Sequence, residues 1–120
     1  MNFILPLFLL AVTLPAETTL YRTGESLYFE KGCNGCHGTK AEGMTGYPGL
    51  ANRAKGFLAY KLERFRDKLS DSQQQEMMIP FAQNLSDADI KALSTFLSDF
   101  RDEQTEQYDS EYVPWGDGGS

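Results

Sequence analysis

The sequence contains few of the residues from which small exported domains and catalytic sites are commonly built. Its 120 residues include two cysteines, Cys33 and Cys36, and one histidine, His37. Because both cysteines lie in one short segment, no disulfide framework can stabilise the fold. Because there is no second histidine, a metal site that uses two histidines of one chain is excluded. Any metal or cofactor site that uses Cys or His must therefore centre on this segment.

Positive charge is missing from both ends of the chain. Residues 1–16 contain no Lys or Arg, and residues 102–120 carry six acidic side chains and no basic one. Of the 17 acidic residues, the remaining 11 are balanced by 11 basic ones, so the formal charge of −6 comes from this tail. We expect residues 102–120 to be a disordered, solvated tail. A nucleic-acid partner is excluded, because no basic cluster is present to neutralise phosphates.

No apolar run is long enough to cross a bilayer, which takes about 20 residues. The longest run covers residues 3–14, is followed by Pro15 and Ala16, and has the length of the hydrophobic part of a signal peptide. We expect residues 1–16 to be a secretory leader cleaved after Ala16, with an uncleaved membrane anchor as the alternative. The mature domain would then be residues 17–101.

Three segments have the apolar spacing of helices, and no segment has the pattern of a strand. Residues 23–31 predict a short helix that Gly32 ends. Residues 56–69 predict an amphipathic helix, and residues 70–76 a polar connector. Residues 86–100 predict the last helix, with Ser86 and Asp89 as its capping pair. Apolar residues of the last two helices predict the core: Leu58, Leu62, Phe65, Leu69, Ile90, Leu93, Phe96, Leu97 and Phe100.

Cys33, Cys36 and His37 are arranged as Cys-x-x-Cys-His, the pattern to which a c-type haem is attached. Each thiol can add to a vinyl group of the porphyrin, and the histidine can bind the iron from the proximal side. A zinc site would need a fourth Cys or His, which the chain lacks. A thioredoxin-like centre would need a βαβ unit, and strands are absent. We therefore predict one covalently attached haem c and its iron.

Methionine is the natural candidate for the second axial ligand of the iron, because a thioether favours the reduced state. Met1 would leave with the leader, and Met44 follows His37 too closely to pass easily around the porphyrin edge. Met77 and Met78 lie beyond the second predicted helix and can reach the opposite face. Core packing of this pair is the alternative interpretation.

The chain resembles the class I c-type cytochromes, most closely the small bacterial periplasmic carriers with a single haem. The likeness covers residues 23–99. Gly24 and Tyr28 resemble the first-helix pattern that packs on the last helix at Leu93 and Phe96. Residues 47–50 resemble the family's proline loop, and residues 77–82 resemble its ligand segment. The resemblance implies an all-α class I cytochrome c fold, with three main helices and loops wrapped around one covalent haem.

The resemblance also implies individual roles in the site. Cys33 and Cys36 form the thioethers, and His37 is the proximal ligand. The carbonyl of Pro48 accepts a hydrogen bond from His37 and orients it. Met78 lies seven residues before Leu85, where the family has its distal ligand, and Met77 is the fallback. Leu58 and Leu62 are expected to pack against the porphyrin.

The function implied is that of a periplasmic single-electron carrier of the respiratory chain, not an enzyme, and without a small-molecule substrate. We expect a monomer that meets redox proteins at an exposed haem edge near Asn34, Gly35, Met78 and Ile79. A membrane-bound oxidase or reductase would suit the partner role. Two alternatives remain open: a haem c subunit of a larger dehydrogenase or oxidase, and a haem sensor whose Met78 leaves the iron free for a ligand.

Overall fold

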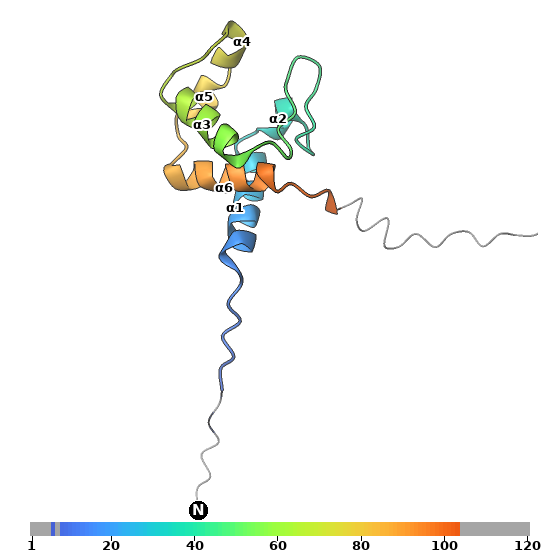
Figure 1. Ribbon diagram of the computed structural model, residues 1–120, viewed down its shortest axis with the longest axis vertical. Coiled ribbons are helices and arrows are strands. Elements are labelled where there is room, and N and C mark those ends of the chain that lie inside the picture. The colour runs from blue at the N-terminus through green and yellow to red at the C-terminus, as the bar shows by residue number, and fades with distance from the viewer. Residues whose placement is uncertain (1–5, 7, 104–120) are drawn as a thin grey trace, which may run out of the picture.

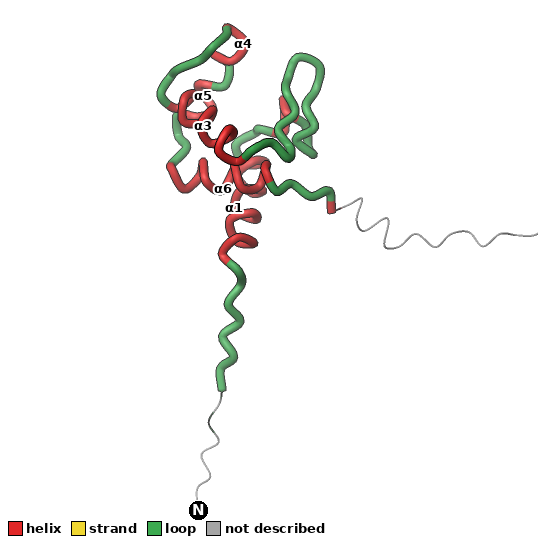
Figure 2. The backbone as a smooth tube through the Cα atoms, in the orientation of Figure 1, coloured by secondary structure: helices red, strands yellow, loops and turns green. Residues whose placement is uncertain are grey.

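The computed structural model describes residue 6 and residues 8–103, and every regular element in this part of the chain is a helix. Three helices form the framework: α1 (Ala16–Glu30), α3 (Lys55–Arg66) and α6 (Asp87–Ser98) (Figure 1). Three helices of one turn lie in the connections: α2 (Asn34–His37), α4 (Gln73–Glu76) and α5 (Ile79–Ala82). Long loops make up the rest (Figure 2). The predicted all-α class is confirmed.

Helix α1 begins at Ala16, well before the predicted start at residue 23. Glu17 lies in its first turn, where the N-terminal end of a helix favours a carboxylate. Tyr21 is only 3% exposed and shares a buried face with Gly24 and Tyr28. The predicted start was wrong because the apolar pattern was counted from Gly24, although Tyr21 is already part of it.

Helices α1 and α6 cross at Gly24 (Figure 1). A Cβ atom at this position would lie 2.0 Å from the carbonyl oxygen of Ala92, so glycine is needed for this close approach. The rings of Tyr28 and Phe96 lie beside the crossing, with their centroids 5.5 Å apart. The expected packing of Gly24 and Tyr28 against the last helix is therefore confirmed.

Helix α1 ends in a Schellman turn that leads directly into the cysteine motif. The N–H of Gly32 donates to the carbonyl of Phe29 at 3.1 Å, and that of Cys33 donates to Tyr28 at 3.0 Å. This turn needs a left-handed residue, and Gly32 has a φ of 77°. Gly32 thus ends the helix as predicted, and the turn fixes the backbone of Cys33.

Helix α3 ends in the same kind of turn, three residues before its predicted end. Lys68 takes the left-handed φ of 62°, and the N–H of Leu69 donates to the carbonyl of Arg64 at 2.9 Å. Leu69 therefore lies outside the helix and is 49% exposed, which contradicts its predicted place in the core. The sequence gives no sign of this end, because lysine seldom takes the left-handed position.

Helix α6 begins with the predicted capping box. The Ser86 hydroxyl accepts from the Asp89 N–H, and the Asp89 carboxylate accepts from the Ser86 N–H, each at 3.0 Å. Ile90, Leu93, Phe96 and Leu97 are buried as predicted. The predicted polar connector of residues 70–76 is not wholly irregular, because it contains α4. The Ser72 hydroxyl caps this helix by accepting from the N–H of Gln75 at 3.2 Å.

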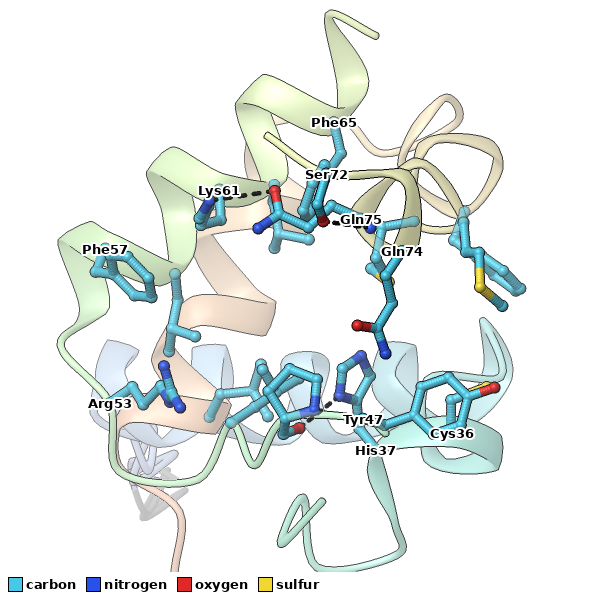
Figure 3. A pocket seen from close by; sticks show the side chains of 18 of the residues that line it. Cys36, His37, Tyr47, Arg53, Phe57, Lys61, Phe65, Ser72, Gln74 and Gln75 are labelled. Atoms are coloured by element: carbon cyan, nitrogen blue, oxygen red, sulfur yellow. Dashed lines mark hydrogen bonds between the residues drawn. The ribbon is translucent and has the colours of Figure 1, made fainter. Parts of the chain in front are cut away.

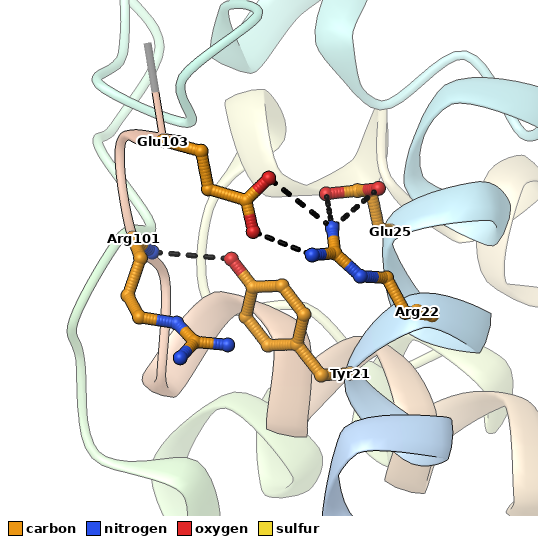
Figure 4. Close-up of polar contacts among 5 residues, drawn as sticks. All are labelled: Tyr21, Arg22, Glu25, Arg101 and Glu103. Atoms are coloured by element: carbon orange, nitrogen blue, oxygen red, sulfur yellow. Dashed lines mark hydrogen bonds and ion pairs between the residues drawn. The ribbon is translucent and has the colours of Figure 1, made fainter. Parts of the chain in front are cut away.

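The ends of the described chain differ in how they contact the domain. Residues 8–15, from the predicted leader, are exposed and run away from the helices (Figure 1). Among the described residues, no helix is both long and apolar enough to cross a membrane. At the other end, two contacts hold the chain after α6 to α1: the Arg101 N–H donates to Tyr21 Oη at 3.1 Å, and Arg22 pairs with Glu103 at 2.6 Å (Figure 4). Lys40 also pairs with Asp102 at 2.9 Å. The predicted disordered tail, residues 102–120, was therefore drawn too long, because Asp102 and Glu103 contact the domain. The rest of that tail, residues 104–120, lies outside the described residues.

Candidate cofactor site

The helices and loops line a cavity of about 660 Å³ (Figure 3). This volume falls within the range of roughly 300–1,000 Å³ that is usual for small-molecule and cofactor pockets. Five regions contribute to it: α2, the loop of residues 38–54, helix α3, residues 72–81 and helix α6. Its apolar lining consists of Leu50, Phe57, Leu58, Leu62, Phe65, Met77, Met78, Phe81 and Leu97.

His37, at the end of α2, points into this cavity (Figure 3). The residue is 6% exposed, and its Nδ1 lies 2.8 Å from the carbonyl oxygen of Pro48. Because a carbonyl oxygen only accepts hydrogen bonds, the proton of the neutral ring belongs on Nδ1. Nε2 then keeps a free electron pair, which makes it suitable for binding a metal ion.

The backbone of His37 is fixed by contacts on both sides. The hydroxyl of Tyr28 donates to the carbonyl of Gly38 at 2.5 Å, and the Gly43 N–H donates to the carbonyl of His37 at 2.8 Å. Burial raises the pKa of Tyr28, so this hydroxyl remains a proton donor at neutral pH. The first contact ties α1 to the residue directly after the histidine.

Cys33 and Cys36 are both free thiols and partly buried, and Cys36 lines the cavity. Burial raises the pKa of the Cys33 thiol. A dithiol redox centre needs a lowered thiol pKa, so this environment argues against the thioredoxin-like alternative. In the described part of the chain, no three His, Cys, Asp or Glu side chains form a group that could hold a metal ion. The zinc alternative therefore gains no support.

Two of the predicted methionines reach the cavity. Met77 and Met78 both line it, on the segment that lies across the opening from α2 (Figure 1). Met78 is partly buried against the core and precedes α5, whereas Met77 is 54% exposed. Met44, 56% exposed in the loop, is not part of the lining. The two predicted porphyrin contacts, Leu58 and Leu62, also line the cavity.

Sequence reasoning missed the polar part of the lining, which includes Arg53, Lys61, Gln74 and Gln75. Lys61 pairs with Asp71 at 3.1 Å. Within the described residues, no carboxylate pairs with Arg53, which faces the cavity from the loop before α3 (Figure 3). No pattern in the sequence separates Arg53 from an ordinary solvated cation, because only the fold brings the loop to the cavity.

These residues fit a covalently attached haem. Its flat, largely apolar ring suits a cavity lined mainly by aliphatic and aromatic side chains. An imidazole with a free Nε2 faces the space, and two thiols stand beside it on the same turn. The ring also carries two carboxylates, for which Arg53 and Lys61 offer positive charge.

Three comparisons with known proteins agree with this geometry. Residues 21–100 match the family described as Cytochrome c. Cytochrome c-554(548) from Halomonas halodenitrificans is 33% identical over 67 residues, which are 55% of this chain and 81% of that protein. The crystal structure of reduced recombinant cytochrome c4 from Pseudomonas stutzeri has a TM-score of 0.60 and 28% identity. That match covers 68% of this chain and 48% of the cytochrome c4 chain, so this chain spans about half of its length.

Proposed function

Because this chain belongs to the cytochrome c family, as a class I c-type cytochrome with covalently bound haem c and its iron, we propose that it is a periplasmic carrier of single electrons. The family implies haem-based electron transfer, and the proposal adds the shuttle role and the compartment. One observation carries it: His37 and Met78 line the same cavity from opposite segments. Two such ligands would leave the iron no open position for a substrate.

We assign the thioether bonds to Cys33 and Cys36 and the proximal ligand to His37. The hydrogen bond to Pro48 supports this assignment, because it holds the proton on Nδ1 and turns Nε2 to the cavity. We assign the distal ligand to Met78, because it is partly buried and directly precedes α5, and keep Met77 as the fallback.

When bound, haem c supplies a reversible one-electron change at its iron. The residues of the chain hold the group and exclude water from it. Leu58 and Phe65 are buried walls of the cavity, 4% and 8% exposed, and Leu62 is a partly buried one. Arg53 and Lys61 would hold the carboxylates. No acid, base or nucleophile is required, and we propose that the protein is not an enzyme.

We propose that redox proteins dock beside the motif, near Asn34, Gly35, Met78 and Ile79. Such encounters are small and weak, which suits a monomeric carrier that must release its partner quickly. The proposed compartment rests on the leader of residues 1–16 and on attachment of haem c after export. The mass of the mature protein, if it begins at Glu17, would support cleavage.

The test of the ligand assignment compares Met78→Ala with Met77→Ala in the haem-loaded protein. We expect Met78→Ala to lose the methionine-to-iron absorption band of the oxidised form and to have a lower reduction potential, because the thioether favours ferrous iron. Met77→Ala, the matched control, should keep both properties. Loss of the band only in Met77→Ala would move the ligand to that residue.

The same preparation separates the carrier from the two alternatives. The reduced wild-type protein should resist carbon monoxide, because the gas must first displace Met78. Immediate binding would favour the haem sensor. Tight co-purification with a catalytic chain would instead favour a haem subunit of a larger dehydrogenase or oxidase.

A further inference from the structure

A hydrogen bond crosses the cavity opening between segments that are far apart in sequence. The side-chain Nε2 of Gln74, in α4, donates to the carbonyl oxygen of Gly46, in the loop after α2. Both residues line the cavity, and the Gln74 side chain reaches toward the side that carries His37 and Tyr47 (Figure 3). The loop presents its carbonyl here with Gly46 in the left-handed region, at a φ of 86°.

The segment that contains Gln74 is anchored separately to helix α3. Asp71 accepts from Lys61 at 3.1 Å and from Arg64 at 2.8 Å, and these two cations lower the pKa of its carboxyl. The Gln75 amide oxygen accepts from the N–H of Asp71 at 3.1 Å. One side of the segment is therefore held by several contacts that do not involve the loop.

On the loop side the segment has far fewer contacts. Among the hydrogen bonds and ion pairs of the described residues, the one from Gln74 to Gly46 is the only one that joins residues 69–82 to residues 38–54. Breaking it would free that edge of the segment while the contacts to α3 stay intact. The single bond can thus be tested without dismantling the fold.

Gln74 is also coupled to Met78 through one turn of backbone. The N–H of Met77 donates to the carbonyl of Gln74 at 3.3 Å, and the N–H of Met78 donates to Gln75 at 2.9 Å. A displacement of Gln74 is therefore transmitted to the methionine that follows. We propose that Gln74 is a positioning residue: its hydrogen bond to Gly46 is a strap that keeps Met78 on the iron by tying the segment of Met78 to the loop. This proposal rests on the proposed ligation of the iron by His37 and Met78.

The test measures how fast imidazole binds to the oxidised, haem-loaded protein, because imidazole must replace Met78. Loss of one neutral hydrogen bond should raise the rate about fivefold in Gln74→Ala. Gln74→Glu keeps the length of the side chain but cannot donate at neutral pH, and should show the same increase. The matched control is Gln73→Ala, in the same helix, because Gln73 is exposed and its side chain has no hydrogen bond among the described residues.

The strap would be overturned if imidazole bound both Gln74 variants no faster than it binds Gln73→Ala while the wild type still resisted imidazole. The ligation by Met78 would then remain intact. Immediate imidazole binding by the wild type itself would overturn the ligation and the strap with it. Circular dichroism of each variant checks the fold. A fivefold increase with unchanged helicity therefore supports the strap directly.

Discussion

Single hydrogen bonds set the orientation of the proximal histidine. The carbonyl of Pro48 fixes the ring of His37, and the carbonyl of Gly38, directly after the histidine, is held by the Tyr28 hydroxyl. Tyr28 is fully buried, at 0% exposure, so water cannot replace its hydroxyl as the donor to the Gly38 carbonyl. A change at Tyr28 therefore acts on the site through the backbone, without touching the cofactor.

We expect Tyr28→Phe to lower the free energy of unfolding of the haem-loaded protein by about 1–2 kcal/mol, because the Gly38 carbonyl would lose its buried donor. Tyr60→Phe is the matched control, since Tyr60 is 54% exposed and has no hydrogen bond through its hydroxyl among the described residues. Urea unfolding followed by circular dichroism measures both. Equal midpoints for the two variants would show that the bond contributes nothing.

At the scale of elements, local signals were predictable and long-range ones were not. The start of α6 was predicted because Ser86 and Asp89 satisfy each other within four residues. The end of α3 was missed because Lys68, a residue that rarely adopts positive φ, forms the terminating turn. The early start of α1 was missed because the apolar pattern was counted from Gly24. That count left out Tyr21, whose ring packs against Phe96 of α6 at a centroid distance of 5.2 Å.

Replacing glycine by alanine should have opposite effects on stability at Gly24, in the crossing of α1 and α6, and at Gly56, outside it. Gly24→Ala should destabilise the protein by about 2–3 kcal/mol or more, because its Cβ would overlap the Ala92 carbonyl in a packed crossing. Gly56→Ala, in α3, has open space around its Cβ and should stabilise the protein by up to about 1 kcal/mol. Thermal unfolding of the two variants measures the difference. A Gly24→Ala protein as stable as the wild type would mean that the two helices can separate without loss.

At the scale of the whole molecule, the site divides into a contiguous part and an assembled part. Cys33, Cys36 and His37 were predictable because they are adjacent in sequence and their chemistry requires that spacing. Arg53 and Gln74 were not, because they become neighbours of the cavity only when the loop and α4 close around it. The methionine pair lies between these cases. Chain order limited the choice to Met77 and Met78, the family resemblance favoured Met78, and the partial burial of Met78 against the core agrees with that choice.

The whole molecule should also depend on its cofactor for folding, because the cavity lies among core residues. Without haem, apolar side chains that line this open cavity, such as Leu50, Leu62 and Met78, would face water instead of the porphyrin. The stability of a typical domain is only about 5–15 kcal/mol, so losing the burial that the haem provides is enough to unfold a domain of this size. We therefore expect Cys33→Ser/Cys36→Ser, prepared without haem, to lose most of its helical circular dichroism and to expand in solution. The wild-type haem-loaded protein under the same conditions is the control. Native helicity in the double variant would contradict this dependence, and would mean that α1, α3 and α6 pack stably around a site with nothing in it.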